Sequence, residues 1–529
     1  MLRDDVPGCA EARCVQHYAD PVARPLTILV TISLATAACS SGDSTPTTTS
    51  TTVAVTTTAP ESPREPVDPY DTDKFPAPTI FWEDCGDNLK CGYVDVPVDY
   101  SDPASAETSL YIVRHAATSE SKRVGVLLVN PGGPGFGGSY LAESATRIYD
   151  DALVESFDII GWDPRGTGKS IPAIDCIDDY DKFFASGDAT PDDEAERQES
   201  LDGQKEFTEL CFEKSGGILP YSGTNNSARD MEMIRRALGE ETISYFGFSY
   251  GSELGAIWAT MYPDTVRAAV LDGAIDPNAT SREMVTAQRV GFERSINAFL
   301  ADCSARNGCS FHNDGKAEAA FDQLMIDLEN EPLPTYPDRP ELTRSMALTA
   351  VYQAMYSDEF WDVLAEALDD AQNGDGRGLL DLFDQYFRRQ PDGGYDNGIE
   401  AFLNITCADD PARKTAEQAD AEAESLAKIA PRSSPATIGD YTCLFWPQAL
   451  DPKAKIAAPT SVPILVVGTT GDPATPLEGS RAMAATLGNA LLLVVDADQH
   501  LGYGANGCAV QVISDYLRKL ELPENEAVC

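Results

Sequence analysis

Short apolar runs recur along most of the chain and alternate with segments of helical periodicity. The runs that favour strands are 93–99, 109–116, 124–130, 157–163, 243–249, 266–272, 462–468 and 490–496. The later runs are almost continuously apolar, as expected of parallel strands that are buried on both faces. Segments with helical spacing separate them, at 228–238, 252–261, 477–487 and 511–520. The alternation predicts an α/β protein whose mostly parallel sheet is flanked by helices.

The strand pattern stops between residues 278 and 455. This stretch contains amphipathic segments with acidic polar faces, such as 316–329 and 360–372, which are typical of surface helices. We therefore expect a mainly helical cap inserted into the α/β core. The predicted organisation is a first half of the core at 68–277, the cap at 278–455 and a second half of the core at 456–529.

The N-terminal residues predict export. Residues 25–38 form an apolar run that is too short to cross a bilayer comfortably but suits the core of a signal peptide. Ala37 and Ala38 stand directly before Cys39, as in a bacterial lipobox, although Thr36 occupies a position where Leu is usual. We expect 1–38 to be a signal peptide and Cys39 to carry a lipid that anchors the protein to the outer face of the cell membrane. Secretion without a lipid is the alternative.

Residues 39–67 predict a tether. Half of residues 40–67 are Ser or Thr, and four more are Pro. Such a segment cannot bury enough apolar surface to offset the entropy lost on ordering. We expect it to hold the folded body away from the membrane.

The charge of the chain is strongly unbalanced. The hydrophobic fraction of 43% and the charged fraction of 23% are ordinary for a globular protein. However, 39 Lys and Arg residues face 85 Asp and Glu residues, which gives a net charge of -46. A field of this sign repels phosphate backbones and anionic lipids, so we expect no nucleic-acid partner and membrane association only through Cys39. We expect a monomer.

The cysteines beyond Cys39 are even in number, which in an exported chain favours disulfides. Their order favours local pairs: Cys85–Cys91, Cys176–Cys211, Cys303–Cys309, Cys407–Cys443 and Cys508–Cys529. A metal site is the competing interpretation, but no C-x-x-C pattern occurs and the chain has only four His. We expect neither a metal nor a cofactor.

A nucleophile is predicted at Ser249. The sequence G-F-S-Y-G at Gly247–Gly251 follows a predicted strand and precedes a predicted helix. This is the context of the G-x-S-x-G elbow, in which glycines permit a tight turn that exposes the serine hydroxyl. The amide of Tyr250, at the start of the helix, is placed to bind an oxyanion.

The base and the acid follow by elimination. His17 lies in the leader, and His115 and His312 are more simply read as structural. His500 follows the last predicted strand, at the sheet edge that would display Ser249. Asp472 follows the preceding strand and lies between Ser249 and His500 in sequence, which is the triad order of this fold. The sequence therefore predicts Ser249, Asp472 and His500 as a catalytic triad.

A second oxyanion donor is expected in the loop N-P-G-G-P-G at 130–135, directly after an earlier strand. Glycines let a backbone amide approach a substrate closely. We choose Gly133, with Gly132 as the alternative. The loop lacks the Lys-Ser/Thr ending of a phosphate-binding P-loop.

Several motifs together resemble one family. They are N-P-G-G-P-G, D-P-R-G-T-G-K-S at 163–170, G-F-S-Y-G, G-D-P-A-T-P around Asp472, N-I-T-C-A-D-D at 404–410 and C-L-F-W-P at 443–447. The set resembles the α/β-hydrolase tripeptidyl aminopeptidases of high-GC Gram-positive bacteria, from about Trp82 to Cys529. The family's serine, acid and histidine fall on Ser249, Asp472 and His500. The resemblance implies an exported serine hydrolase that releases short peptides from free N-termini.

Two other functions stay open. Some relatives in that family are carboxylesterases, so the same triad could hydrolyse small esters or lipid esters. More remotely, the chain could be a non-catalytic surface binding protein on a hydrolase scaffold. The expected substrate is accordingly a peptide or a small ester.

An aminopeptidase needs an acidic group that binds the α-ammonium of its substrate. Glu253, Asp409 and Asp410 are candidates, and the alternative for each is a solvated surface acid. At Glu253 relatives often carry a bulky neutral residue. We further expect Asp163 to pair with Arg165 and fix the loop beside the active site. Thr475 is expected to orient the Asp472 loop.

Overall fold

The computed structural model describes residues 71–529, except for 189, 192, 436–438, 458–459 and 524–525. The predicted signal peptide, the lipid site at Cys39 and the tether lie outside the described residues. Within the described part of the chain, no helix is both long and apolar enough to span a membrane.

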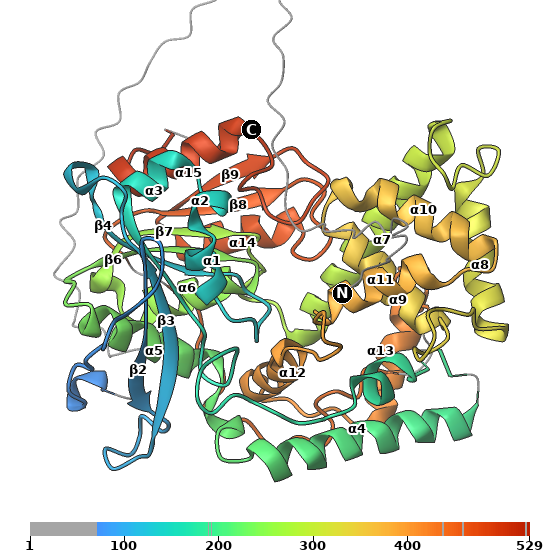
Figure 1. Ribbon diagram of the computed structural model, residues 1–529, viewed down its shortest axis with the longest axis horizontal. Coiled ribbons are helices and arrows are strands. Elements are labelled where there is room, and N and C mark those ends of the chain that lie inside the picture. The colour runs from blue at the N-terminus through green and yellow to red at the C-terminus, as the bar shows by residue number, and fades with distance from the viewer. Residues whose placement is uncertain (1–70, 189, 192, 436–438, 458–459, 524–525) are drawn as a thin grey trace, which may run out of the picture. The chain divides into compact units, whose positions relative to one another are not determined.

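The core is a ten-stranded sheet (Figure 1). Its strands are β1 Glu83–Gly86, β2 Leu89–Pro97, β3 Glu107–His115, β4 Gly125–Asn130, β5 Phe157–Trp162, β6 Ile243–Phe248, β7 Val266–Asp272, β8 Ile464–Thr469, β9 Ala490–Val495 and β10 Ala527–Val528. They lie in the order β1-β2-β3-β5-β4-β6-β7-β8-β9-β10. Pairing is antiparallel from β1 to β5 and parallel from β5 to β10. The carboxyl ends of the parallel strands therefore meet at one edge.

The eight predicted strands are present as β2–β9, with bounds that shift by a few residues. The apolar pattern does not predict β1 or β10. Every residue of β1 is exposed, and β10 has only two residues. A strand that buries nothing leaves no periodic apolar signal in the sequence.

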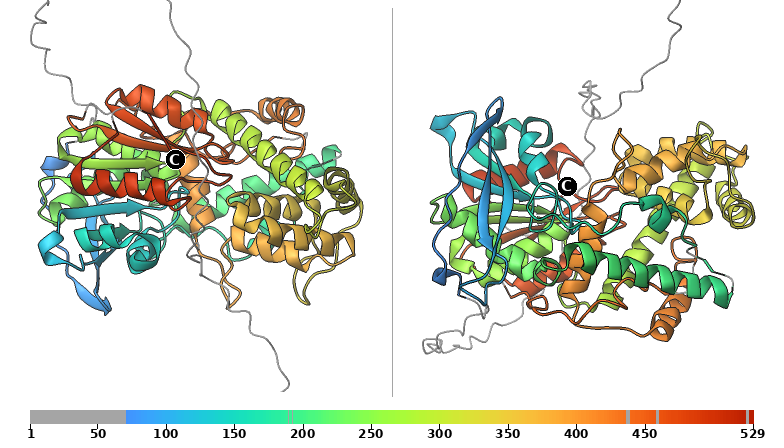
Figure 2. Two further views of the ribbon diagram at one scale, coloured as in Figure 1. Left: turned by 90° about the horizontal axis from the view of Figure 1, so that it is seen from above. Right: turned by 60° about the horizontal axis from the view of Figure 1, so that its bottom comes forward.

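Helices cover both faces of the sheet (Figures 1 and 2). Those packed on it are α1 Ser139–Glu143, α2 Ala145–Ile148, α3 Asp151–Ser156, α5 Thr224–Ala237, α6 Tyr250–Met261, α14 Leu477–Leu487 and α15 Gly507–Lys519. Alternate side chains of β4 separate the two layers: Val126 and Leu128 join the cluster of α5, α6 and α14. Leu127 and Val129 join the cluster of α1, α2, α3 and α15. Burial on both faces explains why β4 is continuously apolar.

Seven α-helices of the described residues lie between β7 and β8 in the chain, and we call them the cap. They are α7 Ser281–Ala305, α8 Ala317–Asn330, α9 Arg344–Met355, α10 Trp361–Gln372, α11 Arg377–Tyr386, α12 Gly398–Asp409 and α13 Ala416–Ala427. Six of them, α7–α12, contribute to a hydrophobic cluster that is distinct from the two clusters of the sheet.

A segment between β5 and β6 belongs to the cap's hydrophobic cluster. It contains α4 Glu194–Ser215, which contributes Phe207 and Cys211 to that cluster. Arg197 on α4 also pairs with Asp420 on α13, with 2.7 Å between Nη2 and Oδ2. Figure 2 shows α4 running beside the cap helices. Residues assigned to the first half of the core by sequence therefore pack in both regions.

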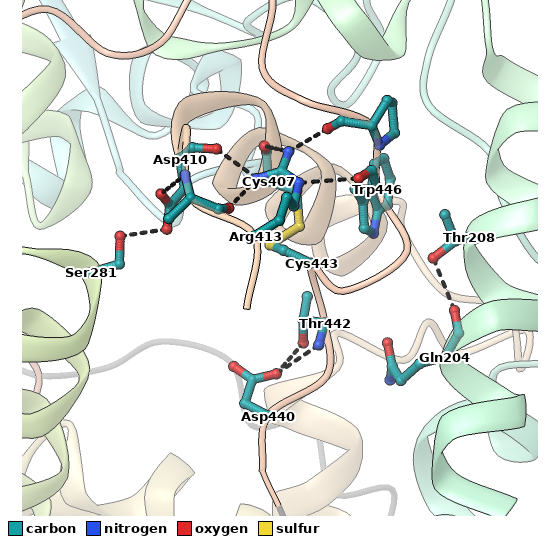
Figure 3. Close-up of a disulfide and its surroundings, with 12 residues drawn as sticks. Gln204, Thr208, Ser281, Cys407, Asp410, Arg413, Asp440, Thr442, Cys443 and Trp446 are labelled. Carbon is teal, nitrogen blue, oxygen red and sulfur yellow. Dashed lines mark hydrogen bonds between the residues drawn. A yellow bond between two sulfur atoms is a disulfide. The ribbon is translucent and has the colours of Figure 1, made fainter. Parts of the chain in front are cut away.

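Five disulfides cross-link the described residues. They join Cys85–Cys91, Cys176–Cys211, Cys303–Cys309, Cys407–Cys443 and Cys508–Cys529, the same pairs that the sequence order predicts. Cys508–Cys529 ties the last residue of the chain to α15. Cys407–Cys443 links α12 to the segment that leads back toward the sheet (Figure 3).

Candidate active site

Ser249 occupies a sharp turn between β6 and α6. Its backbone has φ 54° and ψ -125°, a conformation that costs free energy for a residue with a Cβ. The glycines on either side allow it: a Cβ at Gly247 would lie 2.2 Å from Gly251 O. A Cβ at Gly251 would lie 2.8 Å from Asn130 O. The G-x-S-x-G spacing thus brings strand and helix together and leaves the serine side chain at the strand's carboxyl end.

Asp472 and His500 lie in the loops after β8 and β9 and contact each other directly. His500 Nδ1 is 2.9 Å from both carboxylate oxygens of Asp472. Backbone amides of Ala474 and Thr475 donate to Asp472 Oδ1 at 2.9 and 2.8 Å, and Thr475 Oγ1 donates to Oδ2 at 2.9 Å. The carboxylate is therefore held rigidly, and Thr475 orients it as expected from the sequence.

The other nitrogen of His500 faces no protein partner. Nε2 is buried and has no hydrogen-bond partner among the described residues, and the side chain is only 7% exposed. Burial by itself lowers the pKa of His500, but the adjacent Asp472 carboxylate outweighs it, so the pKa lies above its ordinary value. A buried imidazole fixed through Nδ1 presents Nε2 as a proton acceptor.

Asp272 joins the serine and histidine loops. The backbone amide of Ser249 donates to Asp272 O at 2.8 Å. The Asp272 carboxylate accepts the amides of Gly502 and Tyr503, both at 2.8 Å, just after His500. Burial raises the pKa of Asp272 to about 6. The next residue, Gly273, lies against the imidazole, since a Cβ there would be 3.2 Å from His500 Cε1.

Sequence reasoning missed Asp272. The available signal was a single acid that ends the otherwise apolar run V-R-A-A-V-L-D. A fully buried carboxylate without a cationic partner is expensive unless amides bind it. Its backbone and carboxylate contacts identify it as a positioning residue between the two loops.

The loop after β4 lies against the serine elbow. A Cβ at Gly132 would be 3.0 Å from both Ser249 Cβ and Tyr250 N. The Gly132 amide is engaged, because it donates to Asn130 Oδ1 at 2.9 Å. Within the described residues the Gly133 amide has no such acceptor. The Tyr250 amide, in the first turn of α6, has no carbonyl one turn earlier to bind.

The cap contacts this site through α12 and α9. A Cβ at Gly135 would lie 2.4 Å from Phe402 N, so α12 packs directly on the loop after β4. The His500 amide donates to Tyr356 O at 2.9 Å, and the rings of Tyr356 and His500 meet edge to face at 5.4 Å. Sequence reasoning did not find Tyr356, which lies just after α9 and has no local motif.

Two of the proposed substrate-binding acids lie together near the elbow. Glu253 on α6 is buried and forms an ion pair with Lys453. Asp409, at the end of α12, accepts the Thr224 amide at 2.7 Å and the Thr224 hydroxyl, which also bonds the Tyr250 hydroxyl. Burial raises the pKa of Asp409 to about 6, and Lys453 opposes the rise. Neither acid is a solvated surface group.

Asp410 faces a different neighbour. Its Oδ2 accepts the Ser281 hydroxyl of α7 at 2.6 Å, and its Oδ1 accepts the Ala412 amide at 2.8 Å (Figure 3). The Arg413 side chain beside it donates to backbone carbonyls, including Cys407 O at 2.8 Å. These bonds link the disulfide region to the start of α7.

The expected pairing of Asp163 with Arg165 is wrong. Arg165 is fully buried and pairs with Asp230 on α5, with 2.6 Å between Nη2 and Oδ1. Asp163 instead accepts the amides of Ser139 and Lys169, both at 2.9 Å. Proximity in sequence misled here because the loop turns Arg165 toward α5. Both residues still fix the loop, through separate partners.

The remaining described histidines lie elsewhere. His115 ends β3, and a 3.5 Å contact joins its Nε2 to Asn88 Nδ2. His312 lies in the cap, where its Nδ1 is 2.9 Å from Cys303 O. Among the described residues, no group of three or more His, Cys, Asp or Glu side chains is arranged to hold a metal ion.

Together the sheet order, the elbow and the acid–histidine pair define a class of protein. Residues 125–505 match the alpha/beta hydrolase fold family. The chain belongs to this family, whose members are enzymes, and the sequence-based assignment of fold and enzyme class is confirmed.

The most similar proteins narrow the relationship. The chain is 34% identical to "Serine protease Hip1" of Mycobacterium tuberculosis over 461 residues, which cover 83% of this chain and 87% of that protein. It is 33% identical to "Carboxylesterase B" of Mycobacterium tuberculosis, over 86% of this chain and 90% of that protein. It is 30% identical to "Tripeptidyl aminopeptidase" of Streptomyces lividans, over 85% of this chain and 86% of that protein. The resemblance read from the motifs is thereby confirmed.

Proposed function

We propose that the protein is an exported serine hydrolase that releases short peptides, most simply tripeptides, from free N-termini. The observation that carries the chemistry is the buried His500, bonded to Asp472 through Nδ1 and left without a protein partner at Nε2 among the described residues. Ser249 stands on the neighbouring strained turn, tied through Asp272 to the same loops. This arrangement suits acyl transfer.

In the proposed mechanism, Ser249 Oγ attacks the scissile carbonyl while His500 Nε2 takes its proton. Asp472 holds the imidazole tautomer and stabilises the imidazolium. The Gly133 and Tyr250 amides bind the tetrahedral oxyanion, and each such donor is worth roughly 3 kcal/mol of transition-state stabilisation. His500 then protonates the leaving amine, and water hydrolyses the acyl-enzyme with His500 again acting as base.

Two observations support an N-terminal ammonium as the recognised group. Glu253 and Asp409 place two carboxylates beside a single cation, Lys453, so this buried set keeps an excess of acidic groups. Both acids are connected to the elbow, Glu253 through α6 and Asp409 through Thr224 and Tyr250. We assign this pair, rather than Asp410, to ammonium binding.

Export is supported by the disulfides. Five disulfides among the described residues suit an oxidising compartment such as the cell envelope. We propose that residues 1–38 are removed and that Cys39 carries the lipid anchor. Metabolic labelling with a fatty-acid analogue would detect the lipid, and its persistence in Cys39→Ser would exclude this site.

The peptidase proposal is tested on the purified enzyme with three substrates: a free tripeptidyl anilide, its N-acetylated counterpart and a p-nitrophenyl ester. A tripeptidyl anilide with a free amine should turn over, and its N-acetylated counterpart should turn over much more slowly. Glu253→Gln should lose most of that discrimination, whereas Asp410→Asn should keep it as the matched control. Equal turnover of the free and acetylated peptides would contradict aminopeptidase action.

Ester hydrolysis is the second candidate function, because a relative of similar identity is named a carboxylesterase. It is tested with the p-nitrophenyl ester. The same triad would attack an ester carbonyl. Rapid turnover of p-nitrophenyl esters without any peptide cleavage would favour this function. Absence of both activities, with no labelling of Ser249 by a fluorophosphonate, would favour a non-catalytic binding protein.

A further inference from the structure

Helix α7 of the cap packs directly on the loop that carries Asp472. Gln288 Nε2 donates to Ala474 O at 3.3 Å. One turn further on, a Cβ at Gly291 would lie 2.3 Å from Pro473 O, so only a glycine permits this approach. The middle of α7 therefore lies close to the catalytic acid.

The same part of α7 packs against a cluster of aromatic side chains that extends to the proposed base, His500. The ring of Phe292 lies 4.9 Å from that of Tyr352 and 5.7 Å from that of Tyr356. Tyr356 in turn packs edge to face on His500 at 5.4 Å. Aromatic contacts thus run from Phe292 of α7 through Tyr356, directly after α9, to the imidazole.

Arg289 lies in this group. Its guanidinium is centred 5.2 Å from the ring of Tyr352, and its charge also acts on Tyr356 and Tyr386. The neighbouring Tyr352 helps to raise the pKa of Arg289, so the guanidinium stays charged. The side chain is partly buried.

Among the described residues, the Arg289 side chain has neither the carboxylate partner nor the carbonyl partner that comparable arginines have. Arg165 pairs with Asp230, and Arg229 pairs with Asp451 at 2.6 Å. Arg267, which has no such acid, donates to the Leu517 carbonyl at 2.7 Å. For Arg289 no carboxylate of the described residues lies within 4.0 Å of the guanidinium. Asp440 is the acid whose charge acts on it, and that carboxylate already accepts the Thr442 amide at 2.9 Å.

A guanidinium without a carboxylate partner is unusual among the described residues, because acids outnumber bases in the chain by more than two to one. A partly desolvated cation without an anion is costly, so binding an anionic ligand would stabilise it. Its planar fork of N–H donors fits a carboxylate in particular. Tyr352 supplies a flat aromatic support on one side.

We propose that Arg289 is a specificity residue that binds a carboxylate of the substrate. The inference rests on the proposed peptide substrate, which offers two sources of that group: an acidic side chain near the scissile bond, or the free C-terminus of a short peptide. The long-range field of the protein repels anions, so binding must come from the direct contact with Arg289.

The test uses matched peptides on the full-length enzyme. One pair differs by Asp or Asn beside the scissile bond, and a second pair by a free or amidated C-terminus. We expect the wild-type kcat/KM to favour the carboxylate member of one pair by roughly tenfold to a hundredfold. Arg289→Gln should reduce that ratio to near one, and Arg289→Lys should leave an intermediate ratio because it keeps the charge without the fork.

Arg282→Gln is the matched control, since Arg282 is an exposed arginine in the first turn of the same helix. It should leave both ratios unchanged. The rate of fluorophosphonate labelling of Ser249 should be the same in all variants, which shows that the site remains folded. If fluorophosphonate labels Ser249 poorly in Arg289→Gln, that variant is not used. The kcat/KM ratios of Arg289→Lys for the two peptide pairs then test the proposal.

Two results would overturn the inference: wild-type ratios near one for both pairs, or an unchanged ratio in Arg289→Gln that labels normally. Failure of the proposed function looks different, because no peptide would then be cleaved while labelling persisted. In that case p-nitrophenyl esters with and without an acyl-chain carboxylate replace the peptides. The same ratios on these esters then decide the role of Arg289.

Discussion

The catalytic edge of the sheet and the facing surface of the cap are built in different ways. At the edge, Ser249, Asp472 and His500 follow buried strands, and backbone amides hold the carboxylates of Asp472 and Asp272. Asp472 receives two such amides and Asp272 two more. On the cap, Tyr356 and Arg289 come from or beside long helices and are held mainly by aromatic contacts. The acid–histidine pair is thus placed by local loop geometry, whereas the facing cap residues are placed by the packing of distant segments.

The largest effect should come from the edge. Ser249→Ala removes the nucleophile and should lower kcat by roughly a millionfold. It should also abolish fluorophosphonate labelling, with an unchanged thermal unfolding midpoint. Labelling that survives in Ser249→Ala would show that another residue is the nucleophile.

Asp472→Asn should have the next largest effect. The amide cannot hold the imidazole in the tautomer that leaves Nε2 free, so we expect a loss of about 10⁴-fold in kcat. Steady-state kinetics checks this. Asp498→Asn, a nearby acid without a bond to His500, should remain within a fewfold of wild type; a comparable loss there would contradict the assignment of Asp472.

Replacing a cap residue should cost less. Tyr356→Leu removes the ring beside His500 but keeps the backbone carbonyl that accepts the His500 amide. A small displacement of the imidazole should lower kcat/KM by about tenfold to a hundredfold. Tyr336→Phe, in an exposed part of the cap, serves as control. If Tyr356→Leu lost as much activity as Asp472→Asn, the sheet edge and the cap would not differ in their effect on catalysis.

The smallest effect concerns pH. His500 must be neutral to accept a proton, and its pKa is raised above 6.5 because the Asp472 carboxylate outweighs burial. Activity should therefore rise with pH through a pKa above 6.5. Asp272 also raises that pKa, so Asp272→Asn should move the acidic limb of the kcat/KM profile to lower pH. A shift to higher pH would contradict the electrostatic role of Asp272.

Most of the core could be predicted because its elements carry local signals. Strands β2–β9 are either apolar on both faces or alternate regularly between apolar and polar residues. In G-F-S-Y-G, the glycines are spaced as a tight strand–helix turn around a serine requires. Asp472 and His500 were chosen because each follows such a strand in the expected order, and the structure brings the two side chains into contact. In contrast, β1 buries nothing, and α4 gave no sign that Phe207 and Cys211 would join the hydrophobic cluster of the cap.

The partners of side chains were harder to predict than the positions of elements. Asp163 and Arg165 are neighbours in sequence, yet they bind different partners because the loop between β5 and α5 turns Arg165 inward. Glu253 and Asp409 are far apart in sequence and meet around Lys453. Such contacts depend on how helices pack and have no periodicity along the chain.

By itself, the sequence determined the alternation of strands and helices and the serine elbow, and it predicted the local disulfide pairs and the order of the proposed acid and base, because each depends on local spacing or chain order. The tertiary structure alone decided that Asp272 joins two loops, that Tyr356 of the cap packs on His500, and that Arg289 packs on Tyr352. These depend on contacts between residues tens or hundreds of positions apart, which only the packed fold brings together.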